Sequence, residues 1–251
     1  MTDGALIGWL GVLAAPFLAS FIAVLVDRYP LEEGTVAGRS RCNACRRPLT
    51  VVELLPLLSF VLQKGRCRGC GAPIPRWLPA IELAALLLAA QAMLVLGGGW
   101  QVWIATGLAV TLLGITFIDL RHFLIPDGLS LPLLLAGLAL ALVAPDPWAS
   151  AFDRSLGALL GYLLLAGIAA GYVRLRGREG LGLGDAKLFA AAGAWTGWQG
   201  LPFVLLAASL AGLAGVLGLR LSGRRLGATD AVAFGPYLAL GFWLIWLYGP
   251  P

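Results

Sequence analysis

The chain is dominated by apolar blocks of roughly 20 residues, the length of a helix that crosses a lipid bilayer. Of its 251 residues, 59% are hydrophobic and only 12% are charged, whereas a soluble domain has about 25% charged residues. A large soluble core does not explain this composition, because a soluble protein still needs a polar surface. We therefore predict an all-α polytopic membrane protein with about eight transmembrane helices. The predicted spans are residues 5–27, 79–97, 101–119, 129–144, 154–173, 186–199, 201–219 and 231–248.

The basic residues predict how these helices are oriented. Asp3 precedes the first span without any Lys or Arg, and Arg28 follows it. A cleaved signal peptide has the opposite charge order, so residues 5–27 are expected to remain as a helix whose N-terminus lies outside. Eight spans also place the C-terminus outside. The cytoplasmic loops would then be residues 28–78, 120–128, 174–185 and 220–230.

The distribution of Lys and Arg supports this topology. Of the 18 Lys and Arg residues, all except Arg154 lie in those four loops or, for Lys187, at the edge of one. Such an excess of basic residues is typical of cytoplasmic loops. The net charge of +5 accordingly reflects topology and contact with anionic membrane lipid, and it does not indicate nucleic-acid binding.

One long polar stretch interrupts the apolar blocks. Residues 28–78 are rich in Arg, Gly, Pro and Cys and contain no run long enough to cross a bilayer. We predict three parts: residues 1–27 are the first transmembrane helix, residues 28–78 are a small cytoplasmic domain, and residues 79–251 are a membrane-embedded domain.

The fifth span contains two pairs of glycines with small-xxx-small spacing, Gly157/Gly161 and Gly167/Gly171. Such pairs let helices approach closely. We expect this packing to occur within the chain rather than at a dedicated dimer face.

The cysteines of the chain form two C-x2-C pairs, Cys42/Cys45 and Cys67/Cys70. Each pair makes a tight turn that directs two sulfur atoms toward one point, and two such turns match a tetrahedral Zn²⁺ site. Two disulfides are the alternative, but thiols stay reduced in the cytoplasm. Four protein ligands leave no open position on the metal, so the zinc is predicted to be structural. A domain of roughly 50 residues with few large apolar side chains needs such a cross-link.

Asp119 lies at the end of the third span, after an apolar run. A carboxylate in or near a transmembrane segment is costly and usually marks function. The helix dipole also disfavours a carboxylate at a helix C-terminus. A structural alternative for Asp119 is a salt bridge with Arg121 or Lys187. Asp127, just before the fourth span, is instead predicted to cap that helix.

A second aspartate, Asp185, opens the sixth span. It could cap that helix, and such a role is compatible with catalysis. The predicted topology puts Asp119 and Asp185 on the same face of the membrane at similar depth. Two carboxylates brought together share one proton, and such a pair can activate water and protonate a leaving amide. We therefore predict that Asp119 and Asp185 are the catalytic residues of an aspartic peptidase.

The glycines before Asp185 fit this chemistry. Without a Cβ, the backbone at Gly182 and Gly184 can lie beside an extended peptide. Gly182 and Gly184 are therefore predicted to bind substrate. Lys187, two residues after Asp185, is included among the predicted substrate-binding residues. No Ser-His-Asp arrangement competes, because His122 is the only histidine in the chain.

Five segments occur in a fixed order along the chain. They are “ASFIAVLVDRYP” (19–30), “LLPLLSFVLQKGRCRGCGAPIPRWLPAIELAAL” (54–86), “DLRHFLIPDGLSLPLLLAGL” (119–138), “GLGLGDAKLFAAAGAWTGW” (180–198) and “FGPYLALG” (234–241). Together with the paired cysteines, they resemble the bacterial prepilin peptidases, the type IV leader peptidases of pilus and type II secretion systems. The fourth segment carries the G-x-G-D-x-K-L motif of this family.

The resemblance implies a peptidase with two catalytic aspartates, Asp119 and Asp185, in a multi-pass protein of the bacterial inner membrane. Such an enzyme cuts prepilins or pseudopilins on the cytoplasmic side, after a glycine that ends a short leader. It then N-methylates the new N-terminus with S-adenosylmethionine. With the predicted topology, both termini of the chain would be periplasmic.

Two other classes of protein remain as alternatives. One is a related GxGD intramembrane protease with a different substrate, and the cysteine pairs and “GAPIPRW” (71–77) argue against it. The other is a transporter that uses the same aspartates to bind protons or cations. Incubation with a prepilin in detergent separates the three classes, because only a prepilin peptidase shortens it.

Overall fold

The computed structural model describes residues 3–29, 39–178, 180–223 and 232–250, and this part of the chain is helical and contains no strand. The prediction of an all-α fold is therefore confirmed. The chain divides into two compact units, Met1–Gly114 and Ile115–Pro251. The helices are α1 (Asp3–Asp27), η1 (Val51–Leu54), α2 (Leu58–Leu62), α3 (Trp77–Leu96), α4 (Trp100–His122), α5 (Asp127–Ala141), α6 (Pro147–Arg176), α7 (Leu183–Leu221) and α8 (Gly235–Tyr248).

Five of these helices, α1, α3, α4, α6 and α7, are long and apolar enough to cross a membrane. Two shorter helices, α5 and α8, are also apolar. The predicted spans fall on these helices, and the sixth and seventh spans both belong to α7.

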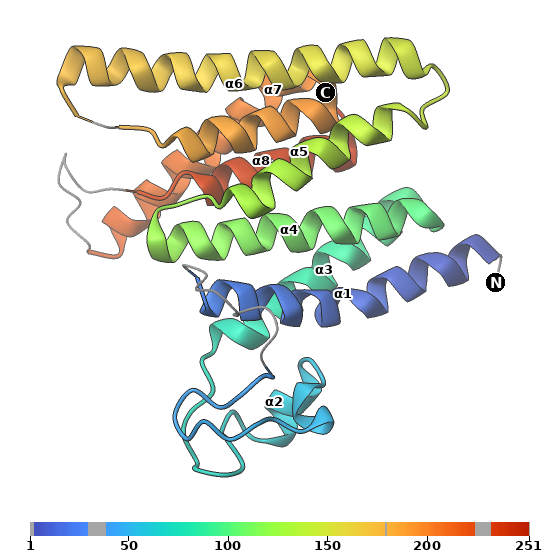
Figure 1. The fold of residues 1–251 in the computed structure, drawn as a ribbon, viewed down its shortest axis with the longest axis vertical. Coiled ribbons are helices and arrows are strands. Elements are labelled where there is room, and N and C mark those ends of the chain that lie inside the picture. The colour runs from blue at the N-terminus through green and yellow to red at the C-terminus, as the bar shows by residue number, and fades with distance from the viewer. Residues whose placement is uncertain (1–2, 30–38, 179, 224–231, 251) are drawn as a thin grey trace. The chain divides into compact units, whose positions relative to one another are not determined.

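The long helix α7 consists of two arms. Gly197 separates them with φ 72° and ψ 173°, a conformation that glycine adopts without a steric penalty. The chain turns back at this residue, so the second arm runs in the opposite direction to the first (Figure 1). One straight helix of 39 residues would be about 58 Å long, far longer than the roughly 30 Å hydrocarbon core of a bilayer. The break agrees with two separate predicted spans, 186–199 and 201–219.

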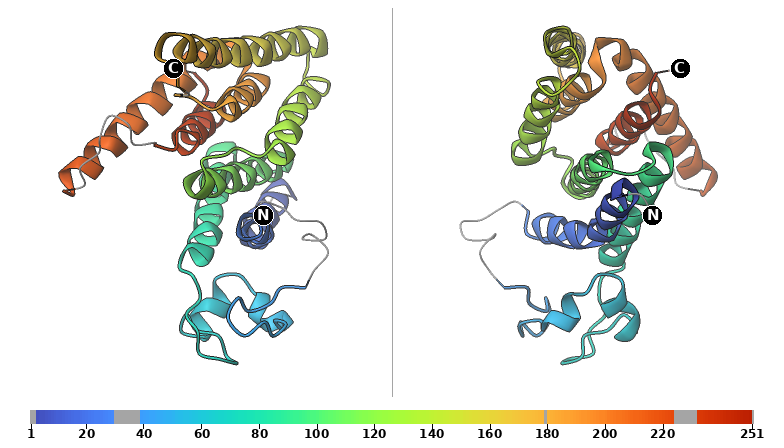
Figure 2. Two further views of the ribbon diagram at one scale, coloured as in Figure 1. Left: turned by 60° about the vertical axis from the view of Figure 1, so that its left-hand side comes forward. Right: turned by 90° about the vertical axis from the view of Figure 1, so that its right-hand side faces the viewer.

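In the first unit, α1 packs against α3 and the first turns of α4. A Cβ on Gly8 would lie only 2.7 Å from the sulfur of Met93, so the small residue allows a close approach. The indole of Trp103 donates a hydrogen bond of 3.0 Å to the carbonyl of Ile7. The cysteine-bearing segment, which includes η1 and α2, connects the C-terminal end of α1 to the N-terminal end of α3 (Figure 2).

In the second unit, α6 lies along α7. A Cβ on Gly157 would come 2.5 Å from the carbonyl oxygen of Gly193, and one on Gly161 would come 2.7 Å from that of Phe189. This glycine pair therefore packs two helices of the same chain, as predicted. The second pair, Gly167/Gly171, has no other described atom within 4 Å of the positions where their Cβ atoms would lie.

Candidate active site and metal centre

The last turn of α4 and the first turns of α5, α7 and α8 lie at the same end of the second unit (Figure 1). Asp119, in the last turn of α4, is only 6% exposed. Its Oδ2 accepts a hydrogen bond of 3.0 Å from the backbone amide of Gly235, the first residue of α8. The positive end of the α8 dipole thus offsets the unfavourable position of this carboxylate at the C-terminus of α4.

The contact with Asp119 requires a residue without a side chain at position 235. A Cβ on Gly235 would lie 2.6 Å from Asp119 Oδ2. Sequence reasoning did not identify Gly235 as a site residue. The sequence does contain one signal for this role, the pair Gly235-Pro236. Proline favours the first turn of a helix, and a helix N-terminus attracts a carboxylate.

Asp185 lies in the first turn of α7 and is 8% exposed. It lies near Asp119, because Ile125 contacts both the glycine that precedes Asp185 and the glycine that binds Asp119. Its Oδ1 is buried and has no hydrogen-bond partner among the described residues. An unpaired buried oxygen is costly, and either a proton shared with the second carboxylate or a bound water would satisfy it.

Ile125 packs against the two glycines that lie next to the aspartates. It is buried. A Cβ on Gly184 would lie 2.9 Å from Ile125 Cβ, and one on Gly235 would lie 3.2 Å from Ile125 Cδ1. Its side chain therefore packs between the backbone that precedes Asp185 and the backbone that binds Asp119. No sequence pattern marks this role, because it depends on contacts between distant segments.

The prediction that Asp127 caps its helix is wrong, and Asp185 does not cap its helix either. Pro126 is the N-cap residue of α5, so Asp127 is the first helical residue, and its Oδ1 lies 2.6 Å from Lys187 Nζ. Proline at this position fixes an extended conformation for entry into the helix. Gly182 is the N-cap residue of α7, and Asp185 lies inside its first turn. The Asp127–Lys187 ion pair instead joins the starts of α5 and α7.

The two glycines predicted to contact substrate have different surroundings. A Cβ on Gly184 would collide with Ile125, so this glycine serves close packing within the protein. A Cβ on Gly182 would meet Asp185 Oδ2 at an ordinary 3.5 Å, with only the amide nitrogen of Gly184 otherwise within 4 Å. Gly182 therefore borders open space beside Asp185.

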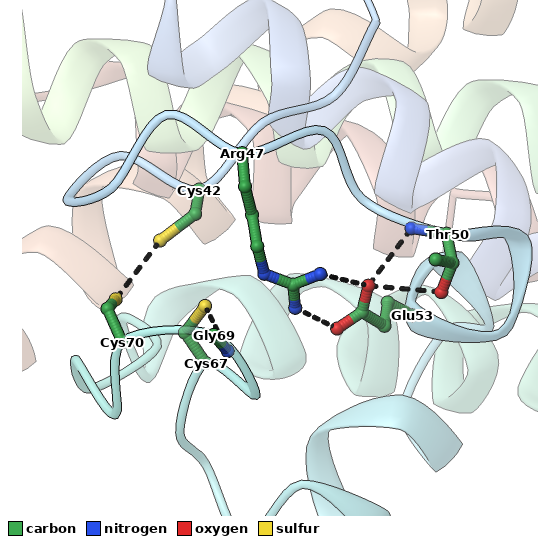
Figure 3. Close-up of polar contacts among 7 residues, drawn as sticks. All are labelled: Cys42, Arg47, Thr50, Glu53, Cys67, Gly69 and Cys70. Atoms are coloured by element: carbon green, nitrogen blue, oxygen red, sulfur yellow. Dashed lines mark hydrogen bonds and ion pairs between the residues drawn. The ribbon is translucent and has the colours of Figure 1, made fainter.

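The four cysteines form a second candidate centre, in the first unit. Their sulfur atoms lie within 4.8 Å of one another, and Cys42 Sγ is 3.9 Å from Cys70 Sγ (Figure 3). None of them is in a disulfide, so the disulfide alternative is wrong. Four sulfur atoms at about 2.3 Å from a tetrahedral Zn²⁺ would be roughly 3.8 Å apart. The cluster can therefore hold a metal ion.

The two cysteine pairs are positioned by one turn that occurs twice. The residue after each second cysteine has a left-handed conformation, with φ 60° at Arg46 and φ 71° at Gly71. Both pairs read C-x2-C-x2-P, so the same short sequence pattern accompanies each turn. In each turn the first cysteine donates its backbone amide to a later carbonyl, Cys42 to Arg47 at 3.0 Å and Cys67 to Ala72 at 2.9 Å.

Arg47 connects the cysteine cluster to a buried carboxylate (Figure 3). Its guanidinium forms an ion pair with Glu53. Glu53 Oε2 also accepts hydrogen bonds of 3.0 Å from both the backbone amide and the hydroxyl of Thr50. The hydrogen bonds from Arg47, followed by the one from the Thr50 amide, lower the pKa of Glu53 to about 2. Glu53 is thus a fixed negative charge that orients Arg47.

The thiol of Cys67 lies in a field that favours its ionised form. Backbone amides of Cys70 and Gly69, followed by the Arg47 side chain, lower the pKa of this thiol to about 6. The Gly69 amide lies 3.4 Å from Cys67 Sγ. The thiolate is the form that binds metals. The surroundings of Cys67 therefore favour the form of this side chain that can bind a metal ion.

The fold and these two centres define a class: a multi-helix membrane protein with two buried carboxylates at adjoining helix ends and a cluster of four cysteines that could hold a metal ion. Comparison with known proteins gives the family. Residues 13–96 match the bacterial peptidase A24 N-terminal domain, and residues 106–217 match the type IV leader peptidase family. The chain belongs to the type IV leader peptidase family.

Relatives named prepilin leader peptidase/N-methyltransferase align with most of the chain. The relative from Aeromonas hydrophila is 44% identical over 92% of this chain and 87% of its own length. The one from Burkholderia pseudomallei (strain 1026b) is 41% identical over 90% of this chain and 72% of its own. The one from Pseudomonas aeruginosa is 39% identical over 85% of this chain and 73% of its own length. No solved structure matches the chain.

Proposed function

We propose that this protein is a membrane aspartic endopeptidase that removes the leader of type IV prepilins or pseudopilins and then N-methylates the new N-terminus. The name of its relatives supports both activities. The observation that best supports the cleavage reaction is that two carboxylates, Asp119 and Asp185, are buried at adjoining helix ends.

In this proposal Asp119 and Asp185 share one proton. The ionised carboxylate takes a proton from water, and the water oxygen attacks the carbonyl carbon of the scissile bond. The protonated carboxyl group first hydrogen-bonds to the carbonyl oxygen. A proton then passes to the leaving nitrogen as the C–N bond breaks. The Gly235 amide keeps Asp119 in place throughout.

The substrate would lie where a short basic leader meets an apolar helix, at the cytoplasmic face of the bacterial inner membrane. The peptide has to be extended there, because the amides of a helix are shielded by their own hydrogen bonds. A glycine before the scissile bond favours this, since glycine weakens a helix by about 1 kcal/mol relative to alanine. The open space beside Gly182 supports binding of such a strand.

Substitution of each aspartate tests the assignment. Asp119→Asn and Asp185→Asn should each abolish cleavage of a purified prepilin in detergent, because a carboxamide keeps the size of the side chain but cannot act as a base. Asp146→Asn is the matched control. Asp146 caps α6 through the amide of Ala149, and asparagine caps helices equally well. Cleavage by either variant at near wild-type rate would refute the catalytic pair.

We also propose that Cys42, Cys45, Cys67 and Cys70 hold one structural Zn²⁺ within a small domain at residues 28–78, between the first helix (1–27) and the catalytic part (79–251). The close sulfur cluster supports this, and elemental analysis should find about one zinc per chain. Cys42→Ser should release it. The proposal would be contradicted if the wild-type protein without metal had the same thermal midpoint as the protein with zinc bound.

The second reaction needs a methyl donor, for which we propose S-adenosylmethionine. Its sulfonium would supply the methyl group to the amine of the cleaved pilin and leave as a neutral thioether, while the amine loses a proton to solvent. Mass spectrometry of the cleaved N-terminus should show a gain of one methyl group only when the donor is present.

A further inference from the structure

The cysteine-bearing segment, residues 39–76, has an apolar face that no described part of the chain covers. This face belongs to η1 and α2, which contact each other. Val51 is 80% exposed and Val61 is 69% exposed. The other side chains of the face, each between 42% and 56% exposed, are Val52, Leu54, Leu58 and Leu62. A contiguous exposed apolar patch outside the spanning helices marks an interaction surface.

The outward side of α2 is apolar, whereas its inward side contains a polar residue. Leu58, Val61 and Leu62 are exposed, while Ser59 and Phe60 line an internal cavity. A surface helix of a soluble domain directs its apolar side to the core and its polar side to water. The exposed side of α2 is therefore suited to an environment that is less polar than water.

Two contacts place α2 at the level where α1 ends and α3 begins. The amide of Leu57, just before α2, donates a hydrogen bond of 2.8 Å to Glu82 Oε2 in the second turn of α3. Ser59 lines the same cavity as Ser20 and Ala23 in the C-terminal third of α1. Both α1 and α3 are long and apolar enough to cross a membrane, so their adjoining ends lie near one membrane surface. The apolar face is therefore held next to that surface.

The charge of the cysteine-bearing segment indicates which kind of surface it meets. Glu53 is its only acidic residue, and this carboxylate is buried in the ion pair with Arg47. Lys64 and Arg66, which follow α2, and Arg76, which precedes α3, are exposed. Four thiolates around Zn²⁺ would add two negative charges, fewer than the exposed basic residues of the segment supply. Basic side chains next to an apolar patch are typical of surfaces that bind anionic lipid.

We propose that the apolar face of η1 and α2 docks on a lipid bilayer that contains anionic phospholipid. The apolar side chains enter the boundary between headgroups and acyl chains, and Lys64 and Arg66 extend toward the phosphates. The segment is tethered at both ends to spanning helices, so the bilayer is present at a high effective concentration. This tethering favours lipid over a soluble protein partner. Docking holds the four cysteines at the membrane surface.

Photocrosslinking identifies what covers the face. Val61→p-benzoylphenylalanine introduces a photoreactive side chain into the full chain, which is placed in nanodiscs of phosphatidylcholine mixed with an equal amount of phosphatidylglycerol. After irradiation, mass spectrometry should find phospholipid attached at residue 61. The same substitution at Gln63 is the control. Gln63 ends the same helix but lines the cavity, so its adducts should be with protein.

Each other product at residue 61 names a different occupant and would overturn the proposal. A crosslinked dimer would show that a second copy of the chain covers the face. A link to a peptide from residues 115–251 would show that the second unit covers it. A chain without any adduct would have a solvated face. Equal lipid yields in nanodiscs of phosphatidylcholine alone would overturn the part assigned to Lys64 and Arg66.

A substitution within the face tests the same contact from a second position. With p-benzoylphenylalanine at Leu58, Val61→Glu should lower the yield of lipid adducts by about tenfold, because a carboxylate is costly to move out of water and is repelled by anionic headgroups. Val61→Leu keeps the face apolar and should leave the yield unchanged. Zinc content and thermal midpoint report whether both variants are folded. An unchanged lipid yield in folded Val61→Glu would contradict docking through this face.

Discussion

Individual glycines shape the carboxylate site as much as the aspartates do. Gly235 provides the amide that binds Asp119, and Gly184 lets the chain before Asp185 approach Ile125. Both roles come from the missing Cβ, and neither involves a titrating group. Glycine substitutions can therefore separate the position of the carboxylates from their chemistry.

Gly235→Ala should impair cleavage strongly. The new methyl group would lie 2.6 Å from Asp119 Oδ2, so either the carboxylate or the start of α8 must move. A displacement of about 1 Å can cost on the order of 100-fold in rate, and we expect a fall in kcat of between roughly tenfold and 100-fold. Gly128→Ala, in the first turn of α5 with open space around it, is the control and should be neutral. Equal activity of the two variants would argue against the amide contact.

The two glycines before Asp185 should respond differently to substitution by alanine. Gly184→Ala should lower the thermal midpoint, because its Cβ would lie 2.9 Å from Ile125 Cβ. Gly182→Ala should leave the midpoint unchanged and raise KM for prepilin, because its methyl group would project into open space next to Asp185. Michaelis–Menten kinetics and a melting curve in detergent measure both effects. An unchanged KM for Gly182→Ala would remove this residue from the substrate-binding surface.

The candidate site residues that the sequence predicts are those with a locally visible signal. Asp119 and Asp185 stood out because carboxylates are rare next to apolar runs, and the cysteines stood out by their spacing. Ile125 and Gly235 could not be identified in this way, since their roles depend on contacts with segments far along the chain. Asp127 was misassigned because helix starts are assigned from local preference, and the proline before it already occupies the cap position.

At the level of helices, one exposed ion pair joins the two elements that frame the carboxylates. Asp127 begins α5, and Lys187 lies in the first turns of α7, close to Asp185. Exposed pairs of this kind contribute only about 0–1 kcal/mol to stability. The pair is therefore expected to affect how α7 is placed more than whether the protein folds.

A charge swap tests this role for the ion pair. Asp127→Lys and Lys187→Asp should each reduce cleavage several-fold without a large change in thermal midpoint, because like charges would push the starts of α5 and α7 apart. The double variant should recover much of the lost activity. If Lys187 contacts the substrate directly, as the sequence suggested, the swap would fail to restore cleavage even though the ion pair is rebuilt.

For the whole molecule, the apolar blocks predicted the helices well because length and hydrophobicity are local properties. They did not show that the sixth and seventh spans form one element with a sharp turn, which depends on the conformation of Gly197. This turn decides the topology, since a single crossing by α7 would place everything after it on the opposite side of the membrane.

The hydrogen bond between Gly235 and Asp119 supports two crossings by α7. It holds the start of α8 at the level of the α4 C-terminus, which is also the end of the second unit where α7 begins (Figure 1). If α7 crossed only once, the connection to α8 would have to pass back through the membrane. With two crossings, α7 ends on the side where it began. Arg220 is then on the same side as Lys187, and we predict this side to be cytoplasmic because basic residues are enriched there.

Alkaline phosphatase, which is active only in the periplasm, can distinguish these topologies when it is fused at two positions. Fused after Gly223, just beyond α7, it should be inactive, and fused after Gly249, just beyond α8, it should be active. Green fluorescent protein at the same positions is the reciprocal control, because it fluoresces after folding in the cytoplasm. A single crossing by α7 would invert both pairs of results. It would also separate the start of α8 from Asp119, so the inverted pattern would overturn the topology and the proposed support of Asp119 together.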